Sequence, residues 1–122
     1  MTLTVPILMG LLAAGAEPVR LSVTDEGKTI ETRIGGVLLL TLPFNGGTGY
    51  LWQREPPFLE TIAVREEAVR PSSKRPGAPQ ERMFRITARG AGRVPVKFAL
   101  RRPWEKTARP AGEFRFTLLI RP

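Results

Sequence analysis

The sequence predicts an all-β protein, an antiparallel β-sandwich of about seven or eight strands. Short segments in which apolar and polar residues alternate repeat along the chain after Glu17, and this alternation is typical of strands with one buried face. Glycine and proline clusters separate the segments, as expected where short strands are joined by turns. A chain of 122 residues suits one such domain, because it buries enough surface to fold without disulfides.

Eight segments carry the strand pattern, and the residues between them predict where the chain turns. Asp25-Glu26-Gly27 predicts the first turn, and Gly35-Gly36 ends the second strand. Residues 70–79 form a long polar connection interrupted by proline, which cannot continue a central strand because proline has no N–H to donate. The expected strands span residues 19–23, 28–34, 37–42, 50–54, 61–66, 82–89, 93–101 and 113–121.

Position parity predicts which face of each C-terminal strand is buried. Between Arg93 and Arg101 the apolar residues stand at even positions and the basic ones at odd positions, and the segments around Phe84 and Phe116 repeat the scheme. The even residues are therefore expected to form the core, and the odd ones a solvated, positively charged outer sheet face. The predicted core residues here are Phe84, Ile86, Ala88, Val94, Val96, Phe98, Leu100, Phe114, Phe116, Leu118 and Ile120.

The composition excludes the usual catalytic and metal centres. Cysteine and histidine are absent, aspartate occurs only at Asp25, and serine is scarce, so neither a serine or cysteine triad nor an ordinary zinc site can be assembled. The adjacent Glu66 and Glu67 would point to opposite faces of a strand, which disfavours paired-carboxylate chemistry. The sequence predicts a protein that is not an enzyme and that uses no metal or cofactor.

Residues 1–16 differ in character from the rest of the chain. The stretch from Leu3 to Ala14 is almost wholly apolar, and Ala14-Gly15-Ala16 fits a small-x-small cleavage site before Glu17. This predicts a signal peptide, a mature domain over residues 17–122 and a periplasmic or secreted protein. The positively charged start of a signal peptide is missing, so a misplaced start or a first strand are the alternatives. The stretch is too short to span a bilayer stably.

Two loops stand out among the predicted connections. Asn45-Gly46-Gly47-Thr48-Gly49-Tyr50 places three glycines between two probable core strands, although glycine loses more backbone entropy on folding than any other residue. Arg102-Pro103-Trp104 leaves a large aromatic side chain where strand alternation has ended. If both loops lie at the same end of a sandwich, they form one binding edge.

Three motifs in a fixed order resemble the chagasin-type inhibitors of papain-like cysteine peptidases. They are the run from Asn45 to Trp52, then Gly77-Ala78-Pro79 before a strand, then Arg101-Arg102-Pro103-Trp104-Glu105. The likeness extends from about Val37 to the C-terminus. It departs from the family pattern at Gly46-Gly47, where the family usually has proline and threonine, and at Gln80, where the family often has another glycine.

The resemblance implies an immunoglobulin-like sandwich whose three loops fill the peptidase cleft without being cut. It implies a reversible, competitive inhibitor that works as a monomer, with no metal, cofactor or membrane span and with nucleic acid not its partner. The peptidase-binding residues that it implies are Asn45, Gly46, Gly47, Thr48, Gly49, Tyr50, Gly77, Ala78, Pro79, Arg102, Pro103 and Trp104.

Several of these residues have plainer interpretations. Asn45-Gly46 alone would be an ordinary turn in which the asparagine caps its own backbone. Trp104 is expected to anchor the interface, and the alternative is a core residue at the rim of the sandwich. Arg102 would either meet an acidic group of the peptidase or brace the loop internally, whereas Trp52 is expected in the core.

The formal net charge of +8 supports a rival function of another class. In that hypothesis the chain is a basic immunoglobulin-like binding module for an anionic partner, such as nucleic acid, an acidic glycan or the envelope surface. The predicted basic face lacks the interleaved aromatic residues that single-stranded nucleic acid would stack on. Where the charges lie in the fold decides between the two hypotheses.

Overall fold

The computed structural model describes residues 18–71, 75, 76, 78–105 and 107–122, so the predicted signal peptide at residues 1–16 lies outside the described part. Eight strands and two single-turn 3-10 helices, η1 (Val23–Asp25) and η2 (Gly46–Thr48), make up this part. The strands are β1 (Val19–Leu21), β2 (Thr29–Arg33), β3 (Val37–Phe44), β4 (Leu51–Glu55), β5 (Ile62–Pro71), β6 (Gln80–Ala88), β7 (Gly92–Arg101) and β8 (Gly112–Arg121).

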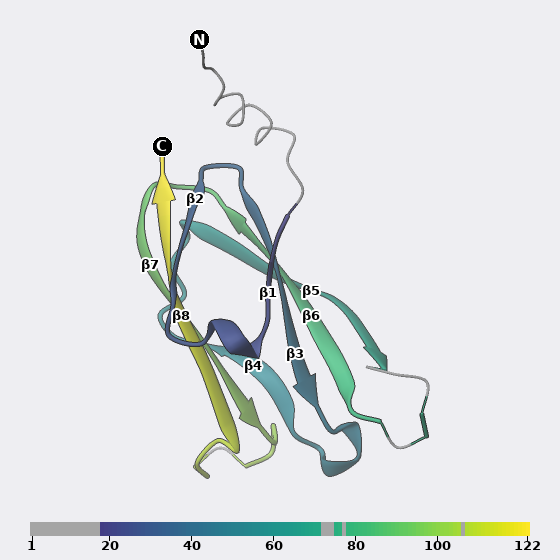
Figure 1. Ribbon diagram of the computed structural model, residues 1–122. Coiled ribbons are helices and arrows are strands. Elements are labelled where there is room, and N and C mark those ends of the chain that lie inside the picture. The colour runs from purple at the N-terminus through teal and green to yellow at the C-terminus, as the bar shows by residue number, and fades with distance from the viewer. Residues whose placement is uncertain (1–17, 72–74, 77, 106) are drawn as a thin grey trace.

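The strands form two four-stranded sheets that pack face to face (Figure 1). The first sheet has the order β1-β3-β6-β5, and the second has the order β2-β8-β7-β4. The predicted β-sandwich is therefore confirmed, and each predicted segment contains a strand. The pairs β3–β6, β5–β6, β4–β7 and β7–β8 are antiparallel, as expected.

Two strand pairs at the sheet edges are parallel, which the sequence analysis did not predict. β1 pairs with β3, and β2 pairs with β8, in the parallel sense. The cause is that the chain reverses direction and also changes sheet between β1 and β2, and does both again between β2 and β3. Glycines with positive φ permit both reversals, Gly27 at +79° and Gly35 at +92°.

The core lies between the sheets and combines residues that parity predicted with side chains of β1, β3, β4 and β5. Side chains from β6, β7 and β8 at even positions are buried, and Phe84 from the first sheet meets Phe98 from the second with ring centroids 4.6 Å apart. Leu100 is only partly buried. The fully buried side chains of largest volume are Phe98, Phe114, Leu38, Leu40, Leu42, Ile86, Leu118 and Val94.

Three prolines lie within strands, each where one side of the strand lacks a hydrogen-bonded neighbour. Pro71 ends β5, which is an edge strand. Pro43 lies beyond the part of β3 that pairs with β1, and Pro95 lies beyond the part of β7 that pairs with β4. In each position the missing N–H breaks no ladder hydrogen bond.

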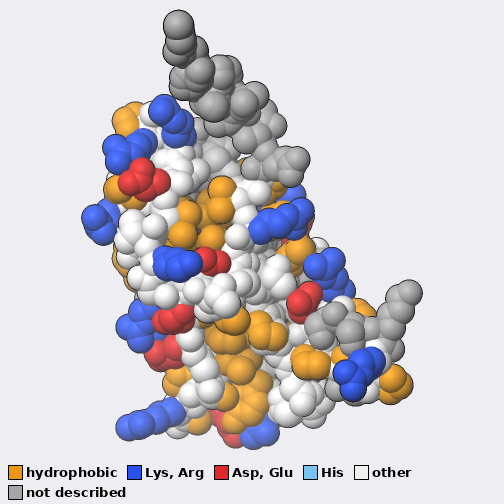
Figure 2. Space-filling model, viewed as in Figure 1, with side chains coloured by type: hydrophobic (Ala, Val, Ile, Leu, Met, Phe, Trp, Pro, Cys, Tyr) orange, Lys and Arg blue, Asp and Glu red, His pale blue; other side chains and the backbone are white. Residues whose placement is uncertain are grey.

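The outer sheet faces carry basic residues, as predicted, but carboxylates stand beside them. Glu67 accepts hydrogen bonds from Arg85 and Arg65, and Glu113 forms ion pairs with Lys97 and Arg115. Figure 2 shows blue and red groups adjoining one another on the face in view. The faces are therefore mosaics of both signs, and this weakens the hypothesis that a whole sheet face binds an anionic partner. Among the described helices, none is long and apolar enough to cross a membrane.

Candidate functional site

The strand register brings the three predicted loops to one end of the sandwich, the loop pole. Phe44, the residue before the first loop (residues 45–50), pairs with Gln80, the residue after the middle loop (residues 72–79). Leu51, the residue after the first loop, pairs with Arg101, the residue before the last loop (residues 102–111). In Figure 1 the end of β3, the start of β6 and the end of β7 all lie at the lower end of the sandwich.

Hydrogen bonds within the first loop hold its glycines in place. Asn45 caps η2, and its side-chain oxygen accepts a hydrogen bond of 3.2 Å from the N–H of Gly47, as the sequence predicted. The hydroxyl of Thr48 donates to the backbone oxygen of Asn45 at 2.8 Å and accepts from the N–H of Tyr50 at 3.4 Å. The loop is thus preorganised, although Gly46 and Gly47 stand where the related motif has proline and threonine.

Gly49 ends the first loop in a left-handed conformation with φ of +83°. A Cβ atom at this position would lie 2.5 Å from Cη2 of Trp104 and 3.3 Å from Cζ2, so the indole packs directly over the glycine backbone. Both the backbone angle and the close approach require glycine here. The first and last loops are therefore in contact, as one binding edge requires.

The two tryptophans differ in burial as the sequence predicted. Trp104 is 67% exposed, so it is not a core residue at the rim of the sandwich. Trp52 is 8% exposed and packs in the core, where its indole N–H donates to the backbone oxygen of Pro43 at 2.8 Å. A large, exposed indole seated on a glycine is available to a partner at little further loss of side-chain entropy.

Arg102 braces the loops internally, which is one of the two roles that the sequence left open. Its Nε donates to the backbone oxygen of Thr48 at 3.0 Å, and its guanidinium lies 4.4 Å from the ring centroid of Tyr50. Glu105 accepts from the same guanidinium at 3.5 Å. The side chain therefore spans from the last loop to the first and links them.

A second arginine anchors the last loop at its base. Arg101 forms an ion pair with Glu55 of β4 at 3.2 Å and donates to the backbone oxygen of Ala108 at 3.0 Å. Sequence reasoning did not single out Glu55, and it named Glu105 only as the last residue of the third motif, without a role. The spacing of Arg102 and Glu105, three residues apart within one loop, is a sequence signal for their ion pair. No such signal marks Glu55.

The middle loop is described only in part. Gly77 lies outside the described residues, whereas Ala78 donates its N–H to the backbone oxygen of Arg75 at 3.1 Å. Pro79 directly precedes β6. Gln80, which replaces a glycine of the related motif, is the first residue of β6 and pairs with Phe44 and with Pro71. The structure thus places Ala78 and Pro79 at the same pole as the other two loops.

The chemistry available at the loop pole is that of binding. The described residues contain no group of carboxylates that would hold a metal ion. Two of the three described carboxyl groups with lowered pKa values belong to strands outside these loops: a hydrogen bond from Arg85 lowers the pKa of Glu67, and one from Arg121 lowers that of Glu31. The loops present backbone, a hydroxyl and an indole, which suit the occupation of a groove.

Comparison with known proteins tests this interpretation. Residues 31–118 match the family model described as chagasin family peptidase inhibitor. The chain belongs to the chagasin family. The resemblance stated from the motifs is thereby confirmed, and so is the prediction of a peptidase inhibitor rather than an enzyme.

Two chagasin-family relatives of known name match most of the chain. It is 29% identical over 100 residues to chagasin from Trypanosoma cruzi, which covers 78% of this chain and 89% of that protein. It is 24% identical over 100 residues to amoebiasin-2 from Entamoeba histolytica, which covers 80% of each.

Three solved structures show that the fold is shared. A crystal structure of a cysteine protease inhibitor from Entamoeba histolytica gives a TM-score of 0.75 at 23% identity and covers 84% of this chain and 95% of that one. The solution structure of amebosin gives a TM-score of 0.65 at 21% identity, over 87% of this chain and 100% of that one. The structure of PbICP-C in complex with falcipain-2 gives a TM-score of 0.58 at 20% identity, over 84% and 99%. The chagasin-type sandwich predicted from the sequence is confirmed.

Proposed function

We propose that this chain is a reversible, competitive inhibitor of papain-like cysteine peptidases that fills the active-site cleft with its three loops. Membership of a peptidase-inhibitor family supports the class of activity. The names of its structural neighbours support the class of target, because one is a cysteine protease inhibitor and another is in complex with falcipain-2. The observation that carries the proposal is the contact of Trp104 with Gly49 at the loop pole.

The geometry suits occlusion of a cleft without cleavage. A segment that enters above a catalytic thiolate must bring its backbone close, and Gly47 and Gly49 add no side-chain bulk there. The thiolate attacks only a carbonyl that it can approach in the right orientation. In the first loop the carbonyls of Asn45 and Thr48 accept hydrogen bonds within the protein, which holds them away from such an approach. The inhibitor thus needs no cofactor and no chemistry of its own.

Titration of papain with the purified protein tests the proposed target. We expect peptidase activity to fall to zero at one equivalent of inhibitor, to return on dilution, and to recover with rising substrate, as competition requires. Trypsin, which has a serine nucleophile, is the control and should be unaffected. Full papain activity in the presence of a large excess of folded inhibitor would show that the target class is wrong.

We further propose that residues 1–16 are a cleaved signal peptide and that the inhibitor works in the periplasm or outside the cell. The apolar stretch from Leu3 to Ala14 and the Ala14-Gly15-Ala16 site support this proposal. N-terminal sequencing of the protein recovered from an expressing bacterium tests it. A mature chain that begins at Glu17 is the expected result, and a chain in the cytoplasm that still begins at Met1 would contradict it.

A further inference from the structure

Four exposed arginines lie at the end of the sandwich opposite the loops, the far pole. Arg20 lies in β1 next to Val19, which pairs with Leu38 at the start of β3. Arg33 and Arg93 lie at the corresponding end of the second sheet, and Arg89 follows the last residue of β6. All four side chains are exposed. Within the described part of the chain, none of them forms a hydrogen bond or an ion pair.

The far pole differs in this respect from the outer sheet faces. There, each described lysine or arginine that points outward from a sheet lies beside a carboxylate, as Arg85 does with Glu67 and Lys97 with Glu113. At the far pole, Glu31 is already paired with Arg121. Glu60 is the one described carboxylate of this pole that has no ion pair, so the four arginines outnumber it. Within the described part of the chain, the far pole therefore carries an excess of positive charge.

Exposed aliphatic side chains lie among these arginines. Val19 is 42% exposed, Ile34 is 48% exposed and Leu59 is 38% exposed. Ile34 lies in the turn between β2 and β3, where its N–H donates to the backbone oxygen of Arg121. Figure 2 shows blue and orange groups next to each other at the upper end of the molecule. The far pole thus combines cationic and aliphatic groups on one surface.

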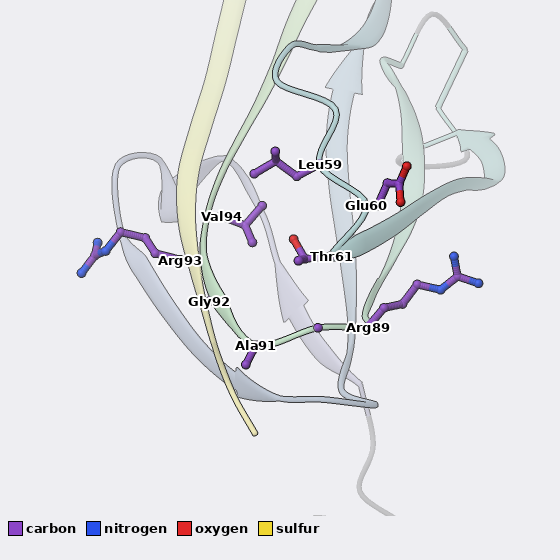
Figure 3. Close-up of a pocket in the computed structure, with 9 residues that line it drawn as sticks. Leu59, Glu60, Thr61, Arg89, Ala91, Gly92, Arg93 and Val94 are labelled. Carbon is purple, nitrogen blue, oxygen red and sulfur yellow. The ribbon is translucent and has the colours of Figure 1, made fainter.

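A hollow of about 330 Å³ opens at the same pole (Figure 3). Leu59, Thr61 and Val94 line it, and Arg89 and Arg93 flank it on opposite sides. The hydroxyl of Thr61 is buried without a hydrogen-bond partner among the described residues. A buried hydroxyl of this kind is uncommon in a folded protein, because an unpaired polar group loses the hydrogen bonds that water would supply. Glu60 also lines the hollow, so its surroundings combine apolar, cationic and anionic side chains with the buried hydroxyl of Thr61.

We propose that the far pole docks on an anionic phospholipid surface. Arginines attract the negative headgroups, and aliphatic side chains enter the boundary between headgroups and acyl chains. Nucleic acid would provide phosphates for the arginines, but it would not bury the exposed valine, isoleucine and leucine side chains in an apolar environment. Because the loops lie at the other end of the fold, a membrane-bound inhibitor would present them to soluble peptidases. The proposal does not depend on the identity of the peptidase.

Sedimentation with lipid vesicles tests the proposal on the full chain. We expect the protein to bind phosphatidylglycerol vesicles and not to bind neutral phosphatidylcholine vesicles. Its affinity for phosphatidylglycerol vesicles should fall as salt rises from about 50 to 200 mM. The double variant R89Q/R93Q should bind phosphatidylglycerol about tenfold or more weakly, since each arginine contributes to attraction by the surface. R65Q/R115Q removes the same charge from the sheet faces and should bind within about threefold of the parent.

Three results would overturn the proposal. The first is an equal loss of vesicle binding in both double variants, which would mean that net charge alone acts. The second is an affinity for a double-stranded oligonucleotide equal to that for the vesicles, with the oligonucleotide competing against the vesicles for the same arginines. The third is a parent protein that self-associates but does not bind the vesicles, together with loss of that self-association in R89Q/R93Q. Peptidase inhibition by R89Q/R93Q should match the parent, which keeps this test separate from that of the proposed function.

Discussion

Gly49 and Trp104 depend on each other, although 55 positions separate them in the chain. The indole lies where the Cβ of any other residue at position 49 would lie, and the left-handed φ of Gly49 turns the chain from η2 into β4. The glycine thus has two physical reasons to be there. The sequence shows only that a glycine precedes an aromatic strand, and not which side chain occupies the space above it.

The first prediction concerns Trp104. Replacing Trp104 with alanine is expected to weaken peptidase binding by about 2 kcal/mol or more, about thirtyfold, because an exposed aromatic anchor is lost. The melting temperature should stay close to that of the parent, because the side chain is 67% exposed. Inhibition titrations and thermal melts measure the two effects.

Trp52→Ala is the matched control for this prediction. It should destabilise the fold by about 3–5 kcal/mol, because it empties a buried site and leaves the backbone oxygen of Pro43 without its donor. If Trp104→Ala inhibits as well as the parent does, the indole is not the anchor.

The second prediction compares two glycines of the same loop. Gly49→Ala should destabilise the protein by about 1–2 kcal/mol through its positive φ and should displace the indole of Trp104. Gly47→Ala should be neutral or stabilising by about 0.4–1 kcal/mol, because its Cβ would meet only Oδ1 of Asn45 at 3.7 Å. Denaturant unfolding and tryptophan fluorescence of the free protein distinguish the two variants. Equal changes in stability for Gly49→Ala and Gly47→Ala would exclude the packing of the Trp104 indole on Gly49.

At the scale of the elements, the first loop is stiffer than its composition suggests. Two glycines stand where the family usually has proline and threonine, and each missing rigidifying residue would by itself loosen the free loop by about 0.4–1 kcal/mol. The structure offsets part of this loss. The cap by Asn45, the hydroxyl of Thr48 and the guanidinium of Arg102 hold the loop from three directions.

The third prediction concerns the link that Arg102 forms between two loops. Arg102→Lys should weaken inhibition by about 1 kcal/mol, roughly fivefold, because lysine cannot donate to Thr48 and stack on Tyr50 as a guanidinium does. Amide hydrogen exchange at residues 46–50 of the free protein should become faster. Arg109→Lys, an exposed change in the same loop, should leave both unchanged. Weaker inhibition with unchanged exchange would instead indicate a direct contact of Arg102 with the peptidase.

The edge strands carry features that discourage pairing with another molecule, which the sequence pattern did not reveal. Arg54 of edge strand β4 shares the core-facing parity of Trp52, and its guanidinium lies 5.3 Å from the ring centroid of Phe58. Burial lowers the pKa of this guanidinium. An inward charge on an edge strand discourages pairing with the edge of another molecule. Edge strand β5 achieves the same with a bulge between Glu66 and Ala68.

At the scale of the whole molecule, ion pairs join strands that are distant in sequence, and they make stability depend on pH. The pKa of Glu67 is lowered by its hydrogen bond from Arg85, that of Glu31 by Arg121, and that of Asp25 by the N–H of Ser22 and by Lys28. A carboxyl group with a lowered folded pKa stabilises the fold above its unfolded pKa. This contribution is lost as pH falls through the lower folded value.

The fourth prediction follows from that sign. The melting temperature should stay level from pH 7 to about 5 and should decline below the ordinary glutamate pKa of 4.5. The decline should be shallower in Glu67→Gln, because that variant has one fewer carboxylate to protonate. High salt should reduce the decline, since all three carboxyl groups are exposed to solvent. Melting temperatures that are equal at pH 3 and pH 7 would show that these pairs add no stability.

The sequence by itself determined the strands and much of the core, and it predicted the residues of the candidate site. Alternation with a period of two fixes which side chains are buried, and glycine and proline mark where strands end, because both effects act over a few neighbouring residues. Val94, Val96 and Phe98 follow this rule. The motifs around Gly49 and Trp104 were sufficient to indicate the family.

Only the tertiary structure decided which residues meet. The parallel pairing of β1 with β3, the internal role of Arg102, the partners Glu55 and Glu105, and the seat of Trp104 on Gly49 all join segments whose separation in sequence carries no local signal. The same holds for charge. The sequence shows an excess of +8, whereas the register of the strands pairs cations of the sheet faces with carboxylates. It leaves Arg20, Arg33, Arg89 and Arg93 at one end with no ion pair among the described residues.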